Sequence, residues 1–139
     1  MSQSTHTVQL DVGLHATRNH IPLIARILLS ALFLWSGVSK ILAPVGTQEY
    51  MTAYGMPLTQ LFLIGAIALE LLAGLSLLLG YKMQLGAIAL IAFTVVATLI
   101  FHTDLSDYIQ QIMLMKNLAI IGGLLMVVQF GGGNVALRS

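Results

Sequence analysis

The sequence predicts an all-α fold, an integral membrane bundle of four antiparallel helices in one domain. Two observations carry this prediction. Hydrophobic residues make up 58% of the 139 residues and charged residues only 8%, with a mean hydropathy of +0.93, which is more apolar than a soluble domain of this length needs. Four stretches are also long and apolar enough to cross a hydrocarbon core of about 30 Å, which takes about 20 helical residues.

The ends of the four predicted spans coincide with residues that start or stop helices. Pro22 falls in the first turn of the first span, where its missing N–H costs nothing, and Pro44 follows the end of that span. Pro57 precedes the second span, and Gly80 closes it as a C-terminal cap. The connections are short, so successive spans should run in opposite directions. The predicted spans are residues 21–42, 58–80, 83–102 and 109–130.

The segments outside the spans predict which side of the membrane each end of the chain occupies. Residues 1–20 are polar and lack the apolar core of a cleavable signal sequence, so we expect a soluble, partly disordered tail. Residues 131–139 form a short C-terminal tail. Arg18, Lys82 and Arg138 share one side in this arrangement, which predicts a multi-pass protein with both termini in the cytoplasm.

The outer loop between the first two spans contains signals for a short helix. Thr47 can cap its start, Tyr50 and Tyr54 are one turn apart, and Gly55 with Pro57 can end it. Tyrosines at this position favour the headgroup region of the bilayer. The segment is therefore either a short interfacial helix or an irregular interfacial loop.

Ionisable residues inside the spans should face the bundle interior, because a charge against lipid costs about 2.5 to 3.5 kcal/mol. Both of the first two spans carry polar and small residues at helical spacing, and Trp35 lies on the opposite face of the first. We therefore expect each stripe to face a neighbouring helix. The stripe of the first span is Arg26, Ser30, Phe33, Gly37 and Lys40, and that of the second is Ala66, Glu70, Gly74 and Leu77.

Glu70 lies in an otherwise apolar run and needs a partner that stabilises its charge. Arg26 is about 8 Å, and Glu70 about 15 Å, from the same side of the membrane, a difference that an extended guanidinium can largely close. The sequence therefore predicts an intramembrane ion pair between Arg26 and Glu70. The alternative is that Glu70 carries protons or binds a substrate.

A second group of polar residues lies near the outer ends of the spans. Each has a simpler interpretation, because lysines at span ends commonly extend to water, an interfacial histidine commonly forms hydrogen bonds, and an asparagine can bond across helices. Their convergence in one leaflet nevertheless predicts a polar pocket that opens outward. The candidate pocket residues are Lys40, Thr98, His102, Lys116 and Asn117.

Glycines in the spans predict close helix contacts, and the candidates are Gly37, Gly74, Gly122 and Gly123.

No metal site is predicted, because the chain has no cysteine and its histidines form no metal-binding motif. Redox chemistry would need a borrowed cofactor, since thiol chemistry is excluded. The net charge of +1 gives no reason to expect nucleic acid, and the partner that the composition implies is the lipid bilayer.

Several segments, taken in order, resemble the DoxX family of small four-span bacterial membrane proteins. The resemblance covers about residues 21–130, and its positions matching the family pattern include most of the candidate site residues. These positions are Arg26, Gly37, Lys40, Glu70, Gly74, His102, Lys116 and Asn117. The segments are ARILLSALFLWSGVSKILAP (25–44), YGMPL (54–58), LELLAGLSLLLG (69–80), TLIFH (98–102) and MKNLAIIGGLLMV (115–127).

The resemblance implies a bacterial inner-membrane protein that is an oxidoreductase or a subunit of one, although the family offers no agreed catalytic residue. We expect the membrane subunit of a redox-linked assembly of the quinone or thiosulfate type, with a quinone as candidate ligand of the pocket and no other cofactor evident. A protein partner or a second copy of the chain is also expected. The alternatives are a non-catalytic scaffold and a small transporter, for which four spans leave little room.

Overall fold

The computed structural model describes residues 3–137, and it describes the side chains of residues 20–137. This part of the chain is entirely helical outside its turns, which confirms the predicted fold class. Four segments are long and apolar enough to cross a membrane: His20–Leu42 within the first helix, and the third, fourth and fifth helices in full. The helices are α1 (Gln3–Leu42), α2 (Pro44–Ala53), α3 (Thr59–Leu79), α4 (Met83–Phe101) and α5 (Tyr108–Phe130).

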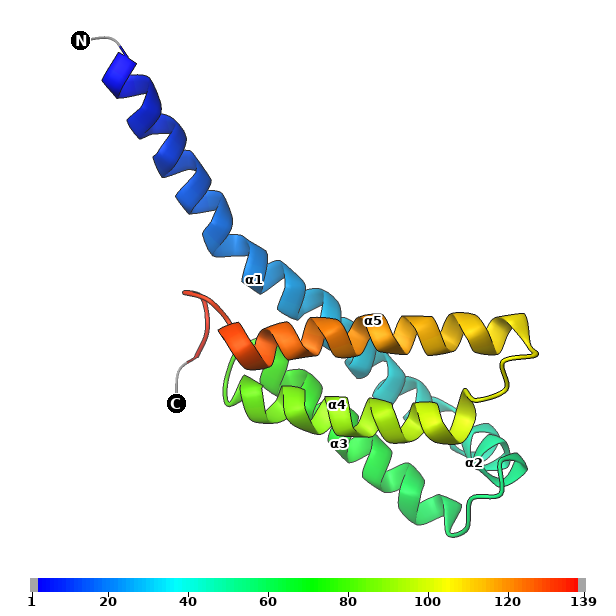
Figure 1. Ribbon diagram of the computed structural model, residues 1–139. Helices are drawn as coiled ribbons and strands as arrows, with labels where there is room; N and C mark the ends of the chain where they lie inside the picture. The colour runs from blue at the N-terminus through cyan, green and yellow to red at the C-terminus, as the bar shows by residue number, and fades with distance from the viewer. Residues whose placement is uncertain (1–2, 138–139) are drawn as a thin grey trace.

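The first helix begins well before its membrane span. α1 starts at Gln3, so the segment predicted as a partly disordered tail is helical, and Pro22 lies inside the helix and not in its first turn. A proline in this position removes one backbone hydrogen bond, and the helix continues on both sides of it. Figure 1 shows the N-terminal part of α1 extending away from the other helices.

The four long helices alternate in direction and form a bundle with two distinct ends (Figure 1). α1 packs mainly on α3, and α4 packs on both α3 and α5, whereas α1 and α5 contact each other less. We call the end that contains the α3–α4 turn and the last turn of α5 the Arg26 end. The opposite end, which carries α2 and the α4–α5 loop, is the Lys40 end.

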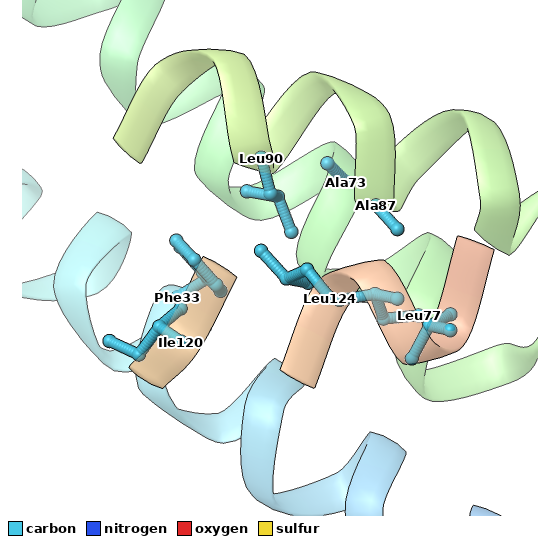
Figure 2. Close-up of a cluster of buried hydrophobic side chains, with 8 residues drawn as sticks. Phe33, Ala73, Leu77, Ala87, Leu90, Ile120 and Leu124 are labelled. Carbon is cyan, nitrogen blue, oxygen red and sulfur yellow. The ribbon is translucent and has the colours of Figure 1, made fainter. Parts of the chain in front are cut away.

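The apolar core lies along the centre of the bundle, where side chains from all four long helices meet (Figure 2). The outer faces are equally apolar, and Trp35 on α1 is 75% exposed. In water such a surface would be strongly unfavourable, and it suits contact with lipid. The core cluster consists of Phe33, Ala73, Leu77, Ala87, Leu90, Ile120, Leu124 and Val127.

Burial confirms the two predicted stripes. On α1, Arg26, Ser30 and Phe33 are all buried, opposite the exposed Trp35. On α3, Glu70 is 2% exposed although its neighbours in the sequence are apolar. The scarce polar groups therefore turn toward neighbouring helices, because lipid offers them no hydrogen bonds.

The short helix of the outer loop forms, but it starts one turn earlier than predicted. α2 begins at Pro44, a residue suited to a first helical position, and Ala43 occupies the N-cap. Thr47 therefore lies inside the helix, where its hydroxyl donates a 2.8 Å hydrogen bond to the Ala43 carbonyl. Gly55, with a φ of 76°, ends the turn after α2 as expected of glycine.

Candidate functional site

Arg26 is fully buried and bonded to backbone carbonyl oxygens. Its guanidinium donates from Nε to Leu77 (2.9 Å), from Nη2 to Leu78 (2.8 Å), and from Nη1 to Gly132 (3.1 Å) and Val135 (2.6 Å). The first two carbonyls belong to the last turn of α3, where helix carbonyls lack partners within the helix. Arg26 therefore caps α3 and ties the segment after α5 to it.

This arrangement corrects the predicted ion pair between Arg26 and Glu70. The end of α3 carries partial negative charge and lies beside Arg26, whereas Glu70 lies about two turns further along α3. Backbone carbonyl oxygens already accept the hydrogen bonds of the Arg26 guanidinium at this position. Glu70 takes its partner from the opposite end of the α1 span.

Glu70 forms its ion pair with Lys40. The Lys40 Nζ lies 2.9 Å from Glu70 Oε2 and donates a 3.1 Å hydrogen bond to Oε1. Ser36, one turn before Lys40, donates to Oε1 at 2.9 Å and accepts from Nζ at 2.6 Å. These three side chains form a closed arrangement across the α1–α3 interface, which we call the Lys40–Ser36–Glu70 network.

The network retains hydrogen-bonding capacity. Glu70 Oε2 is buried at ion-pair distance from Nζ but lacks a hydrogen bond of suitable geometry. Lys40 has three N–H donors, forms hydrogen bonds to Ser36 and Glu70, and keeps 20% of its side chain exposed. The network can therefore offer a Lys40 N–H to a third group, whereas Glu70 Oε2 is enclosed beside Nζ.

A cavity of about 1000 Å³ lies beside this network at the Lys40 end, with residues of all five helices in its wall. Its volume is that of a site for a drug-sized molecule. The wall is mainly apolar and includes aromatic side chains such as Phe33 and Phe93. Polar groups are confined to a few positions, among them the predicted pocket residues Lys40, His102, Lys116 and Asn117.

The fifth predicted pocket residue, Thr98, lies behind the cavity wall and connects two helices. The Asn117 amide donates a 2.8 Å hydrogen bond to the Thr98 hydroxyl, which itself donates to the Thr94 carbonyl at 2.6 Å. All three residues are buried. This part of the predicted cluster therefore holds α4 and α5 together beside the cavity.

His102 takes part in a chain of hydrogen bonds that reaches α2. Its Nδ1 lies 2.7 Å from Gln110 Oε1, and the Gln110 amide donates to the Tyr54 hydroxyl at 3.3 Å. The bonds connect α4, α5 and the C-terminal end of α2. They position α2 across the Lys40 end of the bundle.

Aromatic rings reinforce this contact of α2. Tyr50 stacks on Phe101 with ring centroids 5.2 Å apart, and Tyr54 contacts both rings. Partial desolvation of the ring, which remains 45% exposed, and the adjacent Tyr54 raise the pKa of Tyr50 to about 12. Tyr50 also lines the cavity, so a neutral phenol forms part of its wall.

Lys116 occupies a different environment from Lys40. It is exposed, and its Nζ lies 3.2 Å from the Met113 sulfur. It lies at the margin of the cavity and outside the Lys40–Ser36–Glu70 network. Its placement suits a lysine that extends toward the membrane surface.

Two predicted packing glycines lie in the α1–α3 interface. A Cβ at Gly37 would lie 2.8 Å from Leu71 Cδ2, and one at Gly74 would lie 3.0 Å from Leu34 Cδ2. The absence of side chains lets the two helices approach closely at both positions.

The other two predicted packing glycines differ from each other. Gly123 faces Leu29 of α1 at ordinary contact distance, with 3.4 Å from a built Cβ to Cδ2. Gly122 has no atom of residues 20–137 within 4 Å of the corresponding position, which corrects its predicted role within the bundle. The two glycines are adjacent on a helix, so only one of them can face the interior.

Sequence reasoning missed Ser36, although its spacing of one turn before Lys40 is a usable signal. It also placed Lys40 with the pocket and not with Glu70. Among the described side chains, no three His, Cys, Asp or Glu residues are grouped so that they could hold a metal ion. His6 and His15 lie outside the described side chains.

Comparisons with known proteins agree with the fold. The DoxX family model matches residues 21–103. The inner membrane protein YqjF of Escherichia coli (strain K12) is 39% identical over 111 residues, which cover 80% of this chain and 84% of that protein. The inner membrane protein YphA of the same organism is 31% identical over 127 residues, covering 88% and 91%. No solved structure shows significant similarity.

Proposed function

This chain belongs to the DoxX family, and from that premise we propose that it binds a lipophilic small molecule of the quinone class in the cavity at the Lys40 end, as the membrane subunit of a redox-linked assembly. The observation that carries the proposal is the Lys40–Ser36–Glu70 network at the edge of a large apolar cavity. Such sites commonly combine apolar walls with a few polar groups that fix orientation.

The residues present suit a quinone. Its ring needs apolar walls, which Phe33, Phe93 and Ile120 provide, and its carbonyl oxygens need donors. Lys40 can donate to a carbonyl oxygen, and Glu70 holds the Lys40 ammonium in place for this contact.

Quinones supply two-electron, two-proton redox chemistry when bound, and we propose that a partner oxidoreductase subunit delivers the electrons. The roles of this chain are then to bind the ring, to orient its oxygens through the Lys40–Ser36–Glu70 network, and to exclude water from it. The apolar wall serves the last role because it offers water few hydrogen bonds.

Quinone retention tests this function. The protein is extracted into lipid nanodiscs from its native membrane, and bound quinones are measured by mass spectrometry after washing. We expect wild-type protein to retain quinone and Lys40→Met/Glu70→Gln to lose most of it, since the double change removes both charges without leaving either unpaired. Lys82→Met, at the other end of the bundle, is the matched control. A wild-type protein that retains no quinone would refute the proposal.

A second proposal is that the chain is an accessory subunit that binds a partner protein through the projecting part of α1. α1 begins at Gln3, whereas its apolar span begins at His20 (Figure 1). Deleting residues 3–19 should abolish co-purification of the partner and leave quinone retention unchanged. If the deletion variant also lost its quinone, the projecting part of α1 and the cavity would not have separate roles.

We also propose that both termini lie in the cytoplasm, because the predicted spans place Arg18, Lys82 and Arg138 on one side and basic residues favour the cytoplasmic side. The chain contains no cysteine, so single cysteines report orientation directly. In intact cells, an impermeant thiol reagent should label Asp104→Cys and not Lys82→Cys. The reverse pattern would invert the topology.

A further inference from the structure

We propose that the cavity opens sideways into the bilayer between α3 and α4, through a portal framed by Phe62, Gly65 and Val96. The ligand then enters from the lipid phase. The nature of that ligand rests on the proposed function, whereas the portal itself rests on the packing of two helices.

The two helices are in tight contact at the Arg26 end. A Cβ at Gly86 of α4 would lie 2.7 Å from the Ser76 hydroxyl and 3.2 Å from the Ala73 carbonyl oxygen of α3. Neither group can move far, because Ser76 donates a 2.6 Å hydrogen bond to the Tyr81 carbonyl and the other group is backbone. This contact fixes the register between α3 and α4.

The same two helices diverge toward the Lys40 end (Figure 1). They run antiparallel, so three turns from Ser76 along α3 and three turns from Gly86 along α4 bring Gly65 level with Val96. Among the described residues, no atom lies within 4 Å of a Cβ built on Gly65. At one level, Gly86 of α4 thus allows close approach to α3. Three turns away, Gly65 of α3 faces open space.

Three residues at this level both line the cavity and lie on the outer surface of the bundle. Phe62 is 48% exposed, Val96 is 55% exposed, and Gly65 is exposed as well. Residues of α3 and α4 that belong to both surfaces mark an opening of the cavity between these two helices.

The portal lies at the depth of the acyl chains. Its residues are within about two turns of the ends of α3 and α4, inside both apolar spans, and none of them is polar. A charged solute would have to lose its hydration to pass between such side chains. The portal therefore favours a ligand that is dissolved in the bilayer.

The portal can be tested with a fluorescent reporter on the cavity wall. The chain has one tryptophan, so Trp35→Phe with Phe93→Trp moves the only indole into the cavity lining. Two quenchers are delivered in phosphatidylcholine vesicles: decylubiquinone, which represents the quinone class, and a brominated alkane, which requires no specific binding. Stopped-flow fluorescence gives the rate at which each reaches the reporter.

Gly65→Phe should close the portal, and Gly122→Phe is the matched control, because both glycines are exposed on spanning helices with nothing within 4 Å of a built Cβ. We expect Gly65→Phe to slow quenching by either compound by about tenfold, whereas Gly122→Phe leaves it within about twofold of the reporter protein. Val96→Phe, which narrows the portal from α4, should act like Gly65→Phe and replaces it if that variant does not fold.

The outcomes separate the portal from the proposed function. Saturable quenching by decylubiquinone that Gly65→Phe and Val96→Phe leave unchanged would overturn the portal and preserve quinone binding. Quenching by the alkane that depends on Gly65, without saturable quenching by the quinone, would support the portal and overturn the quinone. Leu32 of α1 also lines the cavity and is 39% exposed, so it represents the competing route past α1. Leu32→Phe adds no second indole to the reporter protein, and quenching that this variant alone slows would also overturn the portal.

Discussion

The two ends of this bundle are built from the same helices and differ in how those helices meet. At the Arg26 end, a buried guanidinium joins α1, α3 and the segment after α5, and Gly86 lets α4 touch α3. At the Lys40 end, the helices separate around a cavity of about 1000 Å³, with α2 lying across it. The comparison teaches that one end is held together by hydrogen bonds to the backbone, whereas the other encloses a cavity.

The largest expected effect is at the closed end. Arg26→Ala leaves four carbonyl oxygens without their donor, and a loss of about 3 to 5 kcal/mol in the free energy of unfolding follows from unpaired buried groups. Arg26→Lys keeps the charge but not the planar fork, so it should fall between wild type and Arg26→Ala. Equilibrium unfolding in mixed detergent micelles measures both. A wild-type stability for Arg26→Ala would refute the capping role.

A smaller effect is expected for the charged network at the open end. Glu70→Gln and Lys40→Met should each destabilise the protein, and the double variant should be more stable than the sum of the two losses predicts, by about 1 to 2 kcal/mol. A double-mutant cycle of unfolding free energies gives this coupling. Additive losses would mean that the two side chains do not interact.

Matched glycine substitutions compare the packing of the two ends directly. Gly86→Ala places a methyl group against Ser76 and the Ala73 backbone and should cost about 1 to 3 kcal/mol. Gly65→Ala enters open space and should stabilise α3 by about 0.5 to 1 kcal/mol, because alanine favours the helix. Thermal unfolding of the two variants shows whether each substitution lowers or raises the stability as expected. Equal effects would mean that α3 and α4 are packed alike at both ends.

The smallest expected effect concerns α2. Because the pKa of Tyr50 is raised to about 12, the folded state holds its proton more tightly than the unfolded state does. Stability from this group is therefore present below the ordinary pKa of 10.0 and is lost as the pH rises toward 12. Absorbance of tyrosinate should show the late titration, and Tyr54→Phe should move it to lower pH. Titration of Tyr50 at its ordinary pKa would contradict the packed aromatic contact.

The sequence was sufficient to predict the fold class and to predict which faces of the first two spans are buried. The cost of exposing polar groups to lipid forces Arg26 and Glu70 inward whatever their partners are, so helical spacing alone identifies the buried stripes.

The partners of these residues were harder to predict, for two physical reasons. The acceptors of Arg26 are carbonyl oxygens, which every residue carries and no sequence pattern marks. Lys40 lies near the end of its span, where a lysine usually extends to water, and its turn toward Glu70 depends on the close approach that Gly37 permits. The convergence of polar residues predicted a pocket at this end, and four of the five candidate residues line the cavity. Its size and its mainly apolar wall could not be predicted, because they result from the separation of helices, which no motif marks.

Cysteine crosslinking tests the contrast between the two ends most directly. In this cysteine-free chain, Ser76→Cys with Gly86→Cys joins α3 and α4 at the closed end, and Gly65→Cys with Val96→Cys joins them at the open end. A disulfide needs Cβ atoms about 3.5 to 4.5 Å apart. Mild oxidation in membranes should therefore link the first pair rapidly and the second slowly or not at all. Equal rates for the two pairs would show that the bundle does not open at the Lys40 end.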